Sequence, residues 1–577
     1  MVIVVIVEGG VCMAYFLKKS KQKNRTYLAI VESFYSPEKK GTAHRTFRSL
    51  GSVETLMKNG IVDPIAHYSR EVEQLNSRRR KEMKSIGDLS PMRNLGYFAV
   101  RSVMKSLDAS GYIDLFSAVN CFKFSLSELV ESLVCARIVS PKSKHKTFHE
   151  VLPLLFEERS FSYDQLLEGI EFIGNNYEKF VEIFTSQLSR KYGTDTRTTL
   201  FDCTNFYFEI DREDDFRRKG PSKENRRSPI VGLGLLLDAN QVPIGMKMYP
   251  GNESEKPVLR EVISTLKKQN SITGRTIHVA DKGLNCSANI ASAVMGNDGY
   301  LFSKSVRSLP EKEKVWVLMK SDDWHEVCDS SGSTLYRYKS CVDEFPYEIT
   351  DAGGRKKKVL LTEKRLLTYS PSLAKKQKGE IDRQVMKARE LCTSQAKRSE
   401  FGDSAKYVRF ASCGSDGKLT GDKIVAGIDV EKVEMAKRLA GYNLLVTSET
   451  DMDDRKIYDT YHTLWRIEES FRIMKSDLDA RPVYLQKEDS IKGHFLICYI
   501  AVLLTRILQI HILRDEYSSN DIYEFIRKMW VVKTDHNYVN VTSRTAFVEA
   551  MCRKTGLPLM NYFLTEKNIK KVLNYRW

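Results

Sequence analysis

The chain has 577 residues, 91 Lys and Arg against 74 Asp and Glu, a formal net charge of +17, and 42% hydrophobic residues. This length is enough for several domains with a sizeable core, and the excess positive charge favours a polyanionic partner. The 11 cysteines include no C-x-x-C pair, which argues against a structural zinc site and favours a reducing, cytoplasmic location.

The N-terminal part, residues 1–85, predicts a small, basic, β-rich module followed by a linker. We expect Met13 to be the natural start, because the residues before it differ in composition from the rest, although a genuine N-terminal strand is the alternative. Strand patterns occur in Ala14–Tyr35 and His44–Leu56, and residues 64–85 predict a charged helix or linker.

Residues 86–195 predict a mostly helical domain. Apolar residues recur at helical spacing in Leu126–Ser140 and in Glu168–Gly193, and Ser140–Glu150 forms a basic turn. A helical bundle with basic turns suits DNA binding, and a scaffold bundle that never touches DNA is the alternative. His145 and His149 have the spacing of metal ligands, but with no third ligand nearby we interpret them as surface residues.

Residues 196–305 predict the first part of an RNase H-like α/β core. Its expected strands are 199–209, 230–237, 242–249, 275–281 and 299–303, with helices at 254–269 and 286–295. Asp202 lies within the first strand and Asp281 ends the fourth. A buried Asp is costly unless it is paired or binds a cation. The alternative for each Asp is a cap or turn residue.

An insertion is predicted at residues 306–436, because the interval between the fourth strand and the last core helix is too long for an undisturbed core. Strand patterns occur at Lys314–Met319, Thr334–Ser340 and Lys357–Glu363, and residues 372–398 predict a strongly basic helix. No Gly-rich phosphate loop is present, which argues against a nucleotide cofactor.

The second part of the core is predicted at 437–515 and further helices at 516–577. The strand Tyr442–Ser448 precedes Tyr458–Tyr484, which predicts one long amphipathic helix. Tyr461, Glu468 and Lys475 lie seven residues apart and share one face of it. With Asp202 and Asp281, Glu468 supplies the hard oxygen ligands that Mg²⁺ or Mn²⁺ requires. An ordinary charged surface helix is the alternative.

These motifs resemble those of DDE transposases from bacterial insertion sequences, in the insertion-sequence-four group. That group carries a Tyr-x2-Arg-x3-Glu-x6-Lys signature, in which Tyr461, Glu468 and Lys475 match. Leu464 stands at the Arg position, and Arg466 and Arg472 are the nearby candidates for its role. The resemblance spans residues 195–510 and also includes Gly220–Asn252, Ala280–Asn285 and Arg481–Tyr484.

The resemblance implies a transposase that binds terminal inverted repeats and target DNA and catalyses strand cleavage and strand transfer. Asp202, Asp281 and Glu468 would hold two Mg²⁺, with Mn²⁺ able to substitute. The expected DNA-phosphate ligands are Tyr461, Arg466, Arg472 and Lys475. Trp316 and Trp324 are candidates to stack a flipped base, with core packing as the alternative.

We also expect a dimer in the DNA-bound complex, no membrane partner, and a bacterial or archaeal cytoplasmic location near the nucleoid. The densest apolar run, Phe495–Leu504, is too short to span a bilayer and predicts a buried helix. Two alternatives stay open. One is a metal-dependent nuclease with the same core and no strand transfer, and the other is a DNA-binding protein with a decayed site.

Overall fold

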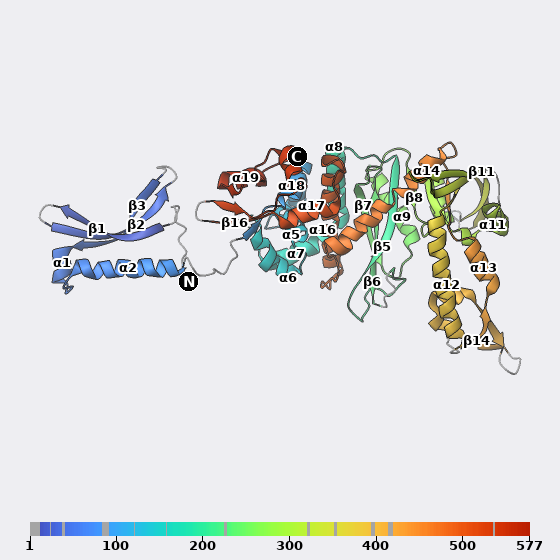
Figure 1. Ribbon diagram of the computed structural model, residues 1–577, viewed down its shortest axis with the longest axis horizontal. Coiled ribbons are helices and arrows are strands. Elements are labelled where there is room, and N and C mark those ends of the chain that lie inside the picture. The colour runs from blue at the N-terminus through green and yellow to red at the C-terminus, as the bar shows by residue number, and fades with distance from the viewer. Residues whose placement is uncertain are drawn as a thin grey trace. The chain divides into compact units, whose positions relative to one another are not determined.

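The computed structural model is divided into two compact units, each described by itself (Figure 1). The first comprises Met1–Arg93, Val531–Val541 and Asn561–Lys567, and the second comprises Asn94–Trp530, Thr542–Met560 and Asn568–Trp577. The structure describes residues 12–22, 25–36, 41–82, 92–120, 122–156, 159–223, 228–269, 271–319, 323–350, 355–393, 398–413, 419–534 and 537–577. The segment before Met13 therefore lies outside the described residues, except for Cys12.

A three-stranded antiparallel sheet forms the main part of the first unit. It contains β1 (Cys12–Gln22), β2 (Arg25–Ser36) and β3 (Gly41–Ser52) in that order, which confirms the strand patterns except at residues 53–56, which are helical. Helix α1 (Val53–Lys58) begins where the Ser52 hydroxyl accepts from the Thr55 amide, and α2 (Pro64–Glu82) packs against β1 and β2. The unit also holds β17 (Tyr538–Asn540), paired with β18 (Phe563–Leu564).

A helical bundle forms the first part of the second unit. It contains α3 (Phe98–Leu107), α4 (Ser110–Val119), α5 (Leu126–Val139), α6 (Lys144–Lys146), α7 (Tyr163–Asn175) and α8 (Tyr177–Tyr192). Helices α3, α5, α7 and α8 all pack against the long helix α16 (Glu488–Arg506). A Cβ at Gly174 would lie 1.6 Å from the Asp489 carbonyl oxygen, and one at Gly493 would lie 2.1 Å from that of Ile170. The contact between α7 and α16 therefore needs glycine on both sides.

A nine-stranded mixed sheet forms the rest of the second unit, in the order β10-β11-β12-β15-β9-β8-β5-β6-β7. Only the pairs β5 with β8 and β8 with β9 are parallel. The strands of the predicted core are β5 (Thr198–Tyr207), β6 (Ile230–Leu237), β7 (Pro243–Pro250), β8 (Ile277–Ala280) and β9 (Gly299–Lys304), with β7 at the edge of the sheet. Helix α9 (Glu255–Lys268) packs on β6 and β7, and α10 (Ser287–Met295) packs on β9.

The predicted insertion adds its strands to this same sheet. They are β10 (His325–Cys328), β11 (Thr334–Thr350) and β12 (Lys356–Tyr369), joined to the core through β15 (Tyr442–Thr447). The remainder contains α12 (Pro371–Thr393), η4 (Arg398–Tyr407), β13 (Val408–Cys413), β14 (Leu419–Ile428) and α13 (Val430–Arg438). Side chains from α12, η4 and α13, including Ile381, Tyr407 and Val433, form a separate small core.

Three predictions of local structure are wrong. Lys314–Met319 lies mostly in helix α11 (Glu311–Leu318), which begins after Pro310 with Glu311 and Glu313 in its first turn, a charge pattern that favours a helix start. Residues 516–577 are predicted to be helical, but besides α17 (Ser519–Lys528) they also hold the strands β16 (Trp530–Lys533), β17 and β18. The helical pattern of Glu168–Gly193 is confirmed by the helices α7 and α8, which are separated at Asn176.

The third concerns Tyr458–Tyr484, which is not one helix. It is divided into α14 (Asp454–His462), α15 (Trp465–Arg472) and the π-helical turn η5 (Ile473–Asp477). Between α14 and α15 the amides of Leu464, Arg466 and Ile467 bond to carbonyls three residues back, a tighter turn than the α-helix.

One helical stretch, Glu488–Ile512, is long and apolar enough to cross a membrane, in the part of the chain that the structure describes. It consists of α16 and the π-helical turn η6 (Ile507–Ile512). Most of its length is buried inside the protein, as in the core helix of a soluble protein. This agrees with the prediction of a buried helix at Phe495–Leu504.

Candidate active site

Two of the predicted acids lie side by side on neighbouring parallel strands. In the register of β5 and β8, Phe201 is opposite Ala280, so the next residues, Asp202 and Asp281, are adjacent. Neighbouring strands are about 4.8 Å apart, and side chains in register on parallel strands point to the same face. The sheet therefore brings Asp202 and Asp281 together.

A lysine and a third carboxylate accompany Asp202. The Lys223 Nζ lies 3.8 Å from Asp202 Oδ1 and 3.6 Å from Glu255 Oε1, and it also donates to the Cys203 carbonyl. Glu255 is the first residue of α9, directly after its cap Ser254. Neither Lys223 nor Glu255 is predicted as a site residue from the sequence, although both lie in the segments that flank the β6–β7 hairpin.

The surroundings of Asp202 disfavour its charged form. Burial raises the pKa of Asp202 to about 6, against the opposing effect of the Lys223 ammonium, and Glu255 and Asp281 raise it further. A carboxyl group in this setting is stabilised as a carboxylate when positive charge is added beside it. The site is therefore suited to bind a cation.

Tyr461 connects the helix α14 to the aspartate pair. Its hydroxyl donates a 2.9 Å hydrogen bond to Asp281 Oδ1, and α14 packs against β8 and β9. Burial, followed by the neighbouring Asp281 carboxylate, raises the pKa of Tyr461 well above its usual value. Tyr461 therefore keeps its proton and acts as a donor.

Glu468 is exposed on α15, and this helix packs against β5 through a buried face that includes Ile467 and Phe471. Within the described parts of the chain, Glu468 has no hydrogen-bond or ion-pair partner. Lys475, seven residues further on, lies with its Nζ 5.5 Å from the centre of the Phe206 ring, on the same strand as Asp202. Tyr461 and Lys475, which precede and follow Glu468 in the signature, thus both lie close to β5 and β8.

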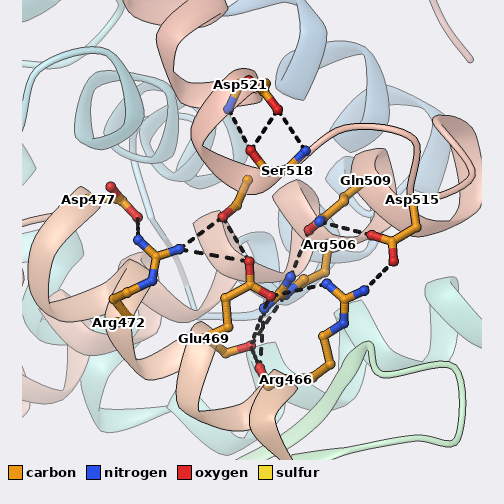
Figure 2. Close-up of polar contacts among 11 residues, drawn as sticks. Arg466, Glu469, Arg472, Asp477, Arg506, Gln509, Asp515, Ser518 and Asp521 are labelled. Carbon is orange, nitrogen blue, oxygen red and sulfur yellow. Dashed lines mark hydrogen bonds and ion pairs between the residues drawn. The ribbon is translucent and has the colours of Figure 1, made fainter. Parts of the chain in front are cut away.

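Glu469, the neighbour of Glu468, is held in an arginine network (Figure 2). Its carboxylate pairs with Arg506 at 2.9 Å and Arg466 at 3.1 Å, and it accepts a 3.0 Å hydrogen bond from the Ser519 hydroxyl. Burial opposes the charge on Glu469, but Arg506, Ser519 and Arg466 outweigh it and hold the pKa of Glu469 below its usual value. Glu469 is therefore fully engaged in fixing α15 to the helices behind it.

The two arginines predicted as phosphate ligands belong to this network. Arg466 is buried and pairs with Asp515 as well as Glu469. Arg472 is half exposed and lies 3.5 Å from Asp477 and 3.8 Å from Glu469 (Figure 2). Arg466 thus has the surroundings of a side chain that fixes the helix, whereas Arg472 keeps part of its surface open to solvent.

The carboxylates that lie together in this site are only part of the ligand set that a hard divalent cation needs. Carboxylate oxygens are the ligands that Mg²⁺ and Mn²⁺ prefer, and Asp202 and Asp281 supply them from adjacent strands. Over the described residues, no group of three or more His, Cys, Asp or Glu side chains is close enough to hold a metal ion. Glu468 lies on a helix that packs on β5 but outside the aspartate pair.

Comparison with known protein families identifies the family of the chain. A family model described as the transposase DDE domain matches residues 193–504, which is more than half of the chain. The chain belongs to the DDE transposase family. The match begins just before β5 and ends within α16, so it covers both aspartates, the insertion and the helix that carries Glu468. No curated protein matches the chain.

A cavity of about 510 Å³ in the transposase opens beside the aspartate pair, between β9 and α12. It begins at Lys282, the residue after Asp281, and includes Ser303, which contacts Tyr461. Its basic lining residues are Lys282, Lys304, Arg307 and Lys406, with Glu380 and Asp403 as the acidic ones. The net positive lining suits a phosphate-rich substrate next to the acids.

The two tryptophans proposed for base stacking are part of one packed cluster. Lys339 places its Nζ 5.0 Å from the centre of the Trp316 ring and 5.1 Å from that of Trp324, and donates to the Trp316 carbonyl at 2.7 Å. Lys339 itself is buried. This arrangement favours core packing for both rings.

Proposed function

We propose that the protein is the transposase of an insertion sequence, which binds the terminal inverted repeats of its element, cuts the DNA strands there and joins the ends to target DNA. The observation that carries the proposal is the pairing of Asp202 and Asp281 on neighbouring parallel strands, next to the helices that carry Tyr461 and Glu468. Membership of the DDE transposase family supports it. The working form would be a DNA-bound dimer in the cytoplasm, close to the nucleoid.

We also propose that the core is RNase H-like. Its strands run in the order β7-β6-β5-β8-β9, with antiparallel pairs on one side of β5 and parallel pairs on the other. Helices α9 and α10 cover this part of the sheet, and α15 packs on β5. The strands β10, β11 and β12 extend the same sheet between the core parts.

Asp202, Asp281 and Glu468 would hold two Mg²⁺ ions, with Mn²⁺ able to replace them. When bound, such ions activate the attacking hydroxyl and stabilise the leaving oxygen of the phosphate. The half-exposed Lys223, which lies between Asp202 and Glu255, would be a further ligand for the DNA phosphate. Tyr461 orients Asp281 through its hydrogen bond.

Lys475, Arg472 and Tyr461 are the proposed phosphate ligands on the helical side of the site. Lys475 is placed over Phe206 on the strand that carries Asp202, and Arg472 is half exposed on the same helical segment. Arg466, predicted as a phosphate ligand, would instead position Glu468 through its contacts with Glu469 and Asp515.

The proposal is tested with labelled duplexes that carry the ends of the element and a supercoiled target plasmid, in Mg²⁺. We expect cleavage at the element ends and joining of those ends to the plasmid. Cleavage without joining would identify a nuclease with the same core. Binding of the ends without cleavage in either Mg²⁺ or Mn²⁺ would identify a DNA-binding protein with a decayed site.

A further inference from the structure

A second cavity, of about 610 Å³, lies in the helical part of the second unit, away from the aspartate pair. Its walls come from the end of α5, the turn into α6, the loop after η5 and α16. The basic residues that line it are Arg137, Lys142, Lys144, His145, Lys146 and His494, and the one acidic residue is Asp479. Tyr163 and Tyr484 complete the opening.

The inner wall of this cavity is a buried basic cluster. Arg137 and Lys144 are each 7% exposed, and His494 is 5% exposed. The Lys144 Nζ lies 3.2 Å from His494 Nδ1, and His494 Nε2 lies 3.0 Å from the Ala480 carbonyl. Since a carbonyl only accepts, the hydrogen-bond network assigns the proton of His494 to Nε2 and leaves Nδ1 to accept from Lys144.

Among the residues that the structure describes, the cluster has no carboxylate partner. Arg137 donates to the Leu478 and Lys142 carbonyls, and in the described chain neither Arg137 nor Lys144 forms an ion pair. Asp479 lines the cavity but is exposed. A buried cation without a counter-ion is costly, and the cost is relieved when an anion binds beside it or the group loses its proton.

The protonation of Lys144 reflects that cost. Burial, followed by the charge of Arg137, lowers the pKa of Lys144 to about 7. Burial, together with Lys144 and Arg137, lowers the pKa of His494 well below its usual value, and burial raises that of Cys498. His494 therefore stays neutral and Cys498 stays a thiol, which leaves Lys144 as the group of the cluster whose charge responds to an anion.

The cavity is joined to the candidate active site by a short piece of chain. The loop Leu478–Ala480, which Arg137 and His494 hold through its carbonyls, directly follows η5 with Lys475. Arg481 then lies 5.0 Å from the centre of the Tyr207 ring, at the end of β5.

We infer that this cavity binds a phosphodiester of the DNA on which the transposase acts, with Lys144 and Arg137 as its inner ligands and Lys142 and Lys146 at its rim. The inference rests on the proposed function. The exposed rim residues Lys142, His145 and Lys146 extend the positive surface outward, as a continuous DNA backbone requires.

The test replaces single phosphates of an element-end duplex by uncharged methylphosphonates, one position at a time, and measures binding to the wild-type protein and to Lys144→Met. For the wild type we expect about a tenfold loss of affinity at one position away from the cleavage site, as for a lost charge-assisted hydrogen bond. Lys144→Met should bind unmodified DNA about tenfold less tightly and be insensitive at that position.

The controls separate charge at the cavity from stability. Met keeps the length of the side chain and removes a buried charge, so the thermal midpoint of Lys144→Met should be unchanged or higher. Lys179→Met, which removes an exposed lysine of α8 paired with Glu182, should keep the full methylphosphonate pattern. If Lys144→Met fails to fold, Lys146→Gln replaces it in the test. This variant changes only the exposed rim and should reduce the same sensitivity to methylphosphonate.

Equal sensitivity of wild type and Lys144→Met at every phosphate would overturn the inference, even with DNA cleavage intact. A rise in the thermal midpoint with inorganic phosphate that Lys144→Met abolishes, without any change in DNA binding, would assign the cavity to free phosphate and also overturn it. If the wild type neither binds nor cuts element ends, the proposed function fails instead.

Discussion

The adjacent glutamates Glu468 and Glu469 should respond to the same change in opposite ways. Glu468 is exposed and lacks a partner among the described residues, whereas Glu469 is tied to Arg506, Arg466 and Ser519. We therefore predict that Glu468→Gln abolishes cleavage without destabilising the protein, and that Glu469→Gln destabilises it.

The magnitudes follow from burial. Arg506 has 0% of its side chain exposed and Glu469 has 12%, so Glu469→Gln leaves a buried guanidinium without its counter-charge. Breaking such a pair costs about 3–5 kcal/mol. Because Gln keeps one acceptor oxygen, we expect a loss near the lower end, about 3 kcal/mol. An exposed site such as Glu468 should change stability by less than about 0.5 kcal/mol.

The assay compares thermal unfolding, end binding and end cleavage in Mg²⁺ for both variants. If Glu468 supplies a metal ligand, losing about 4 kcal/mol of transition-state stabilisation slows cleavage about a thousandfold. Glu469→Gln should retain cleavage at a temperature where it stays folded. Normal cleavage by Glu468→Gln, with lost cleavage in a stable Glu469→Gln, would refute the reasoning and exchange the two assignments.

Three further predictions follow. Asp202→Asn should fold and bind element ends but cut them at least about a thousandfold more slowly in Mg²⁺, and near-normal cleavage would remove Asp202 from the site. Exchanging the exposed α12 residues Lys375, Lys376 and Arg383 for Gln should lower the slope of log affinity against log salt by about 0.9 per lost phosphate contact, and an unchanged slope would mean that this face is only solvated. DNA affinity should fall as pH rises above about 7, the pKa of Lys144, because a neutral amine cannot hold a phosphate. The DNA affinity of Lys144→Met, measured across pH, should not show this fall. An identical pH profile for the wild type and the variant would mean that Lys144 does not cause the fall.

The paired aspartates illustrate what local sequence patterns can predict. Asp202 interrupts an apolar strand and Asp281 closes another, and each pattern depends only on alternation and turn residues nearby in the chain. The structure pairs these two strands in parallel, with the acids in register. For the third acid, the seven-residue spacing from Tyr461 to Glu468 singles out Glu468 from its neighbour, and the partners of Glu469 explain why that neighbour is engaged elsewhere.

The features that escaped prediction depend on contacts between distant segments. Lys223 and Glu255 are 32 positions apart and meet only because the β6–β7 hairpin returns the chain to β5. The break between α14 and α15 leaves the hydrophobic pattern intact, so periodicity does not reveal it. In the basic segment around α6, Lys142 and Lys146 are exposed while Lys144 is buried, a difference fixed by His494 of α16.

The segment from Tyr461 to Arg481 links the candidate active site to the basic cavity. The contacts that fix this segment affect how the two sites act together. Tyr461 is bonded to Asp281, Glu469 is held from behind by Arg506, and the carbonyls of Leu478 and Ala480 accept from Arg137 and His494. Because buried contacts fix this segment at its start, middle and end, Glu468 cannot shift far along the sheet without breaking several of them. Glu468 is therefore better placed to complete a cation site by a change in the conformation of its own side chain than by a movement of the helix. By the same contacts, a phosphate in the basic cavity would hold DNA in a fixed register relative to Glu468, so that binding and cleavage share one rigid frame.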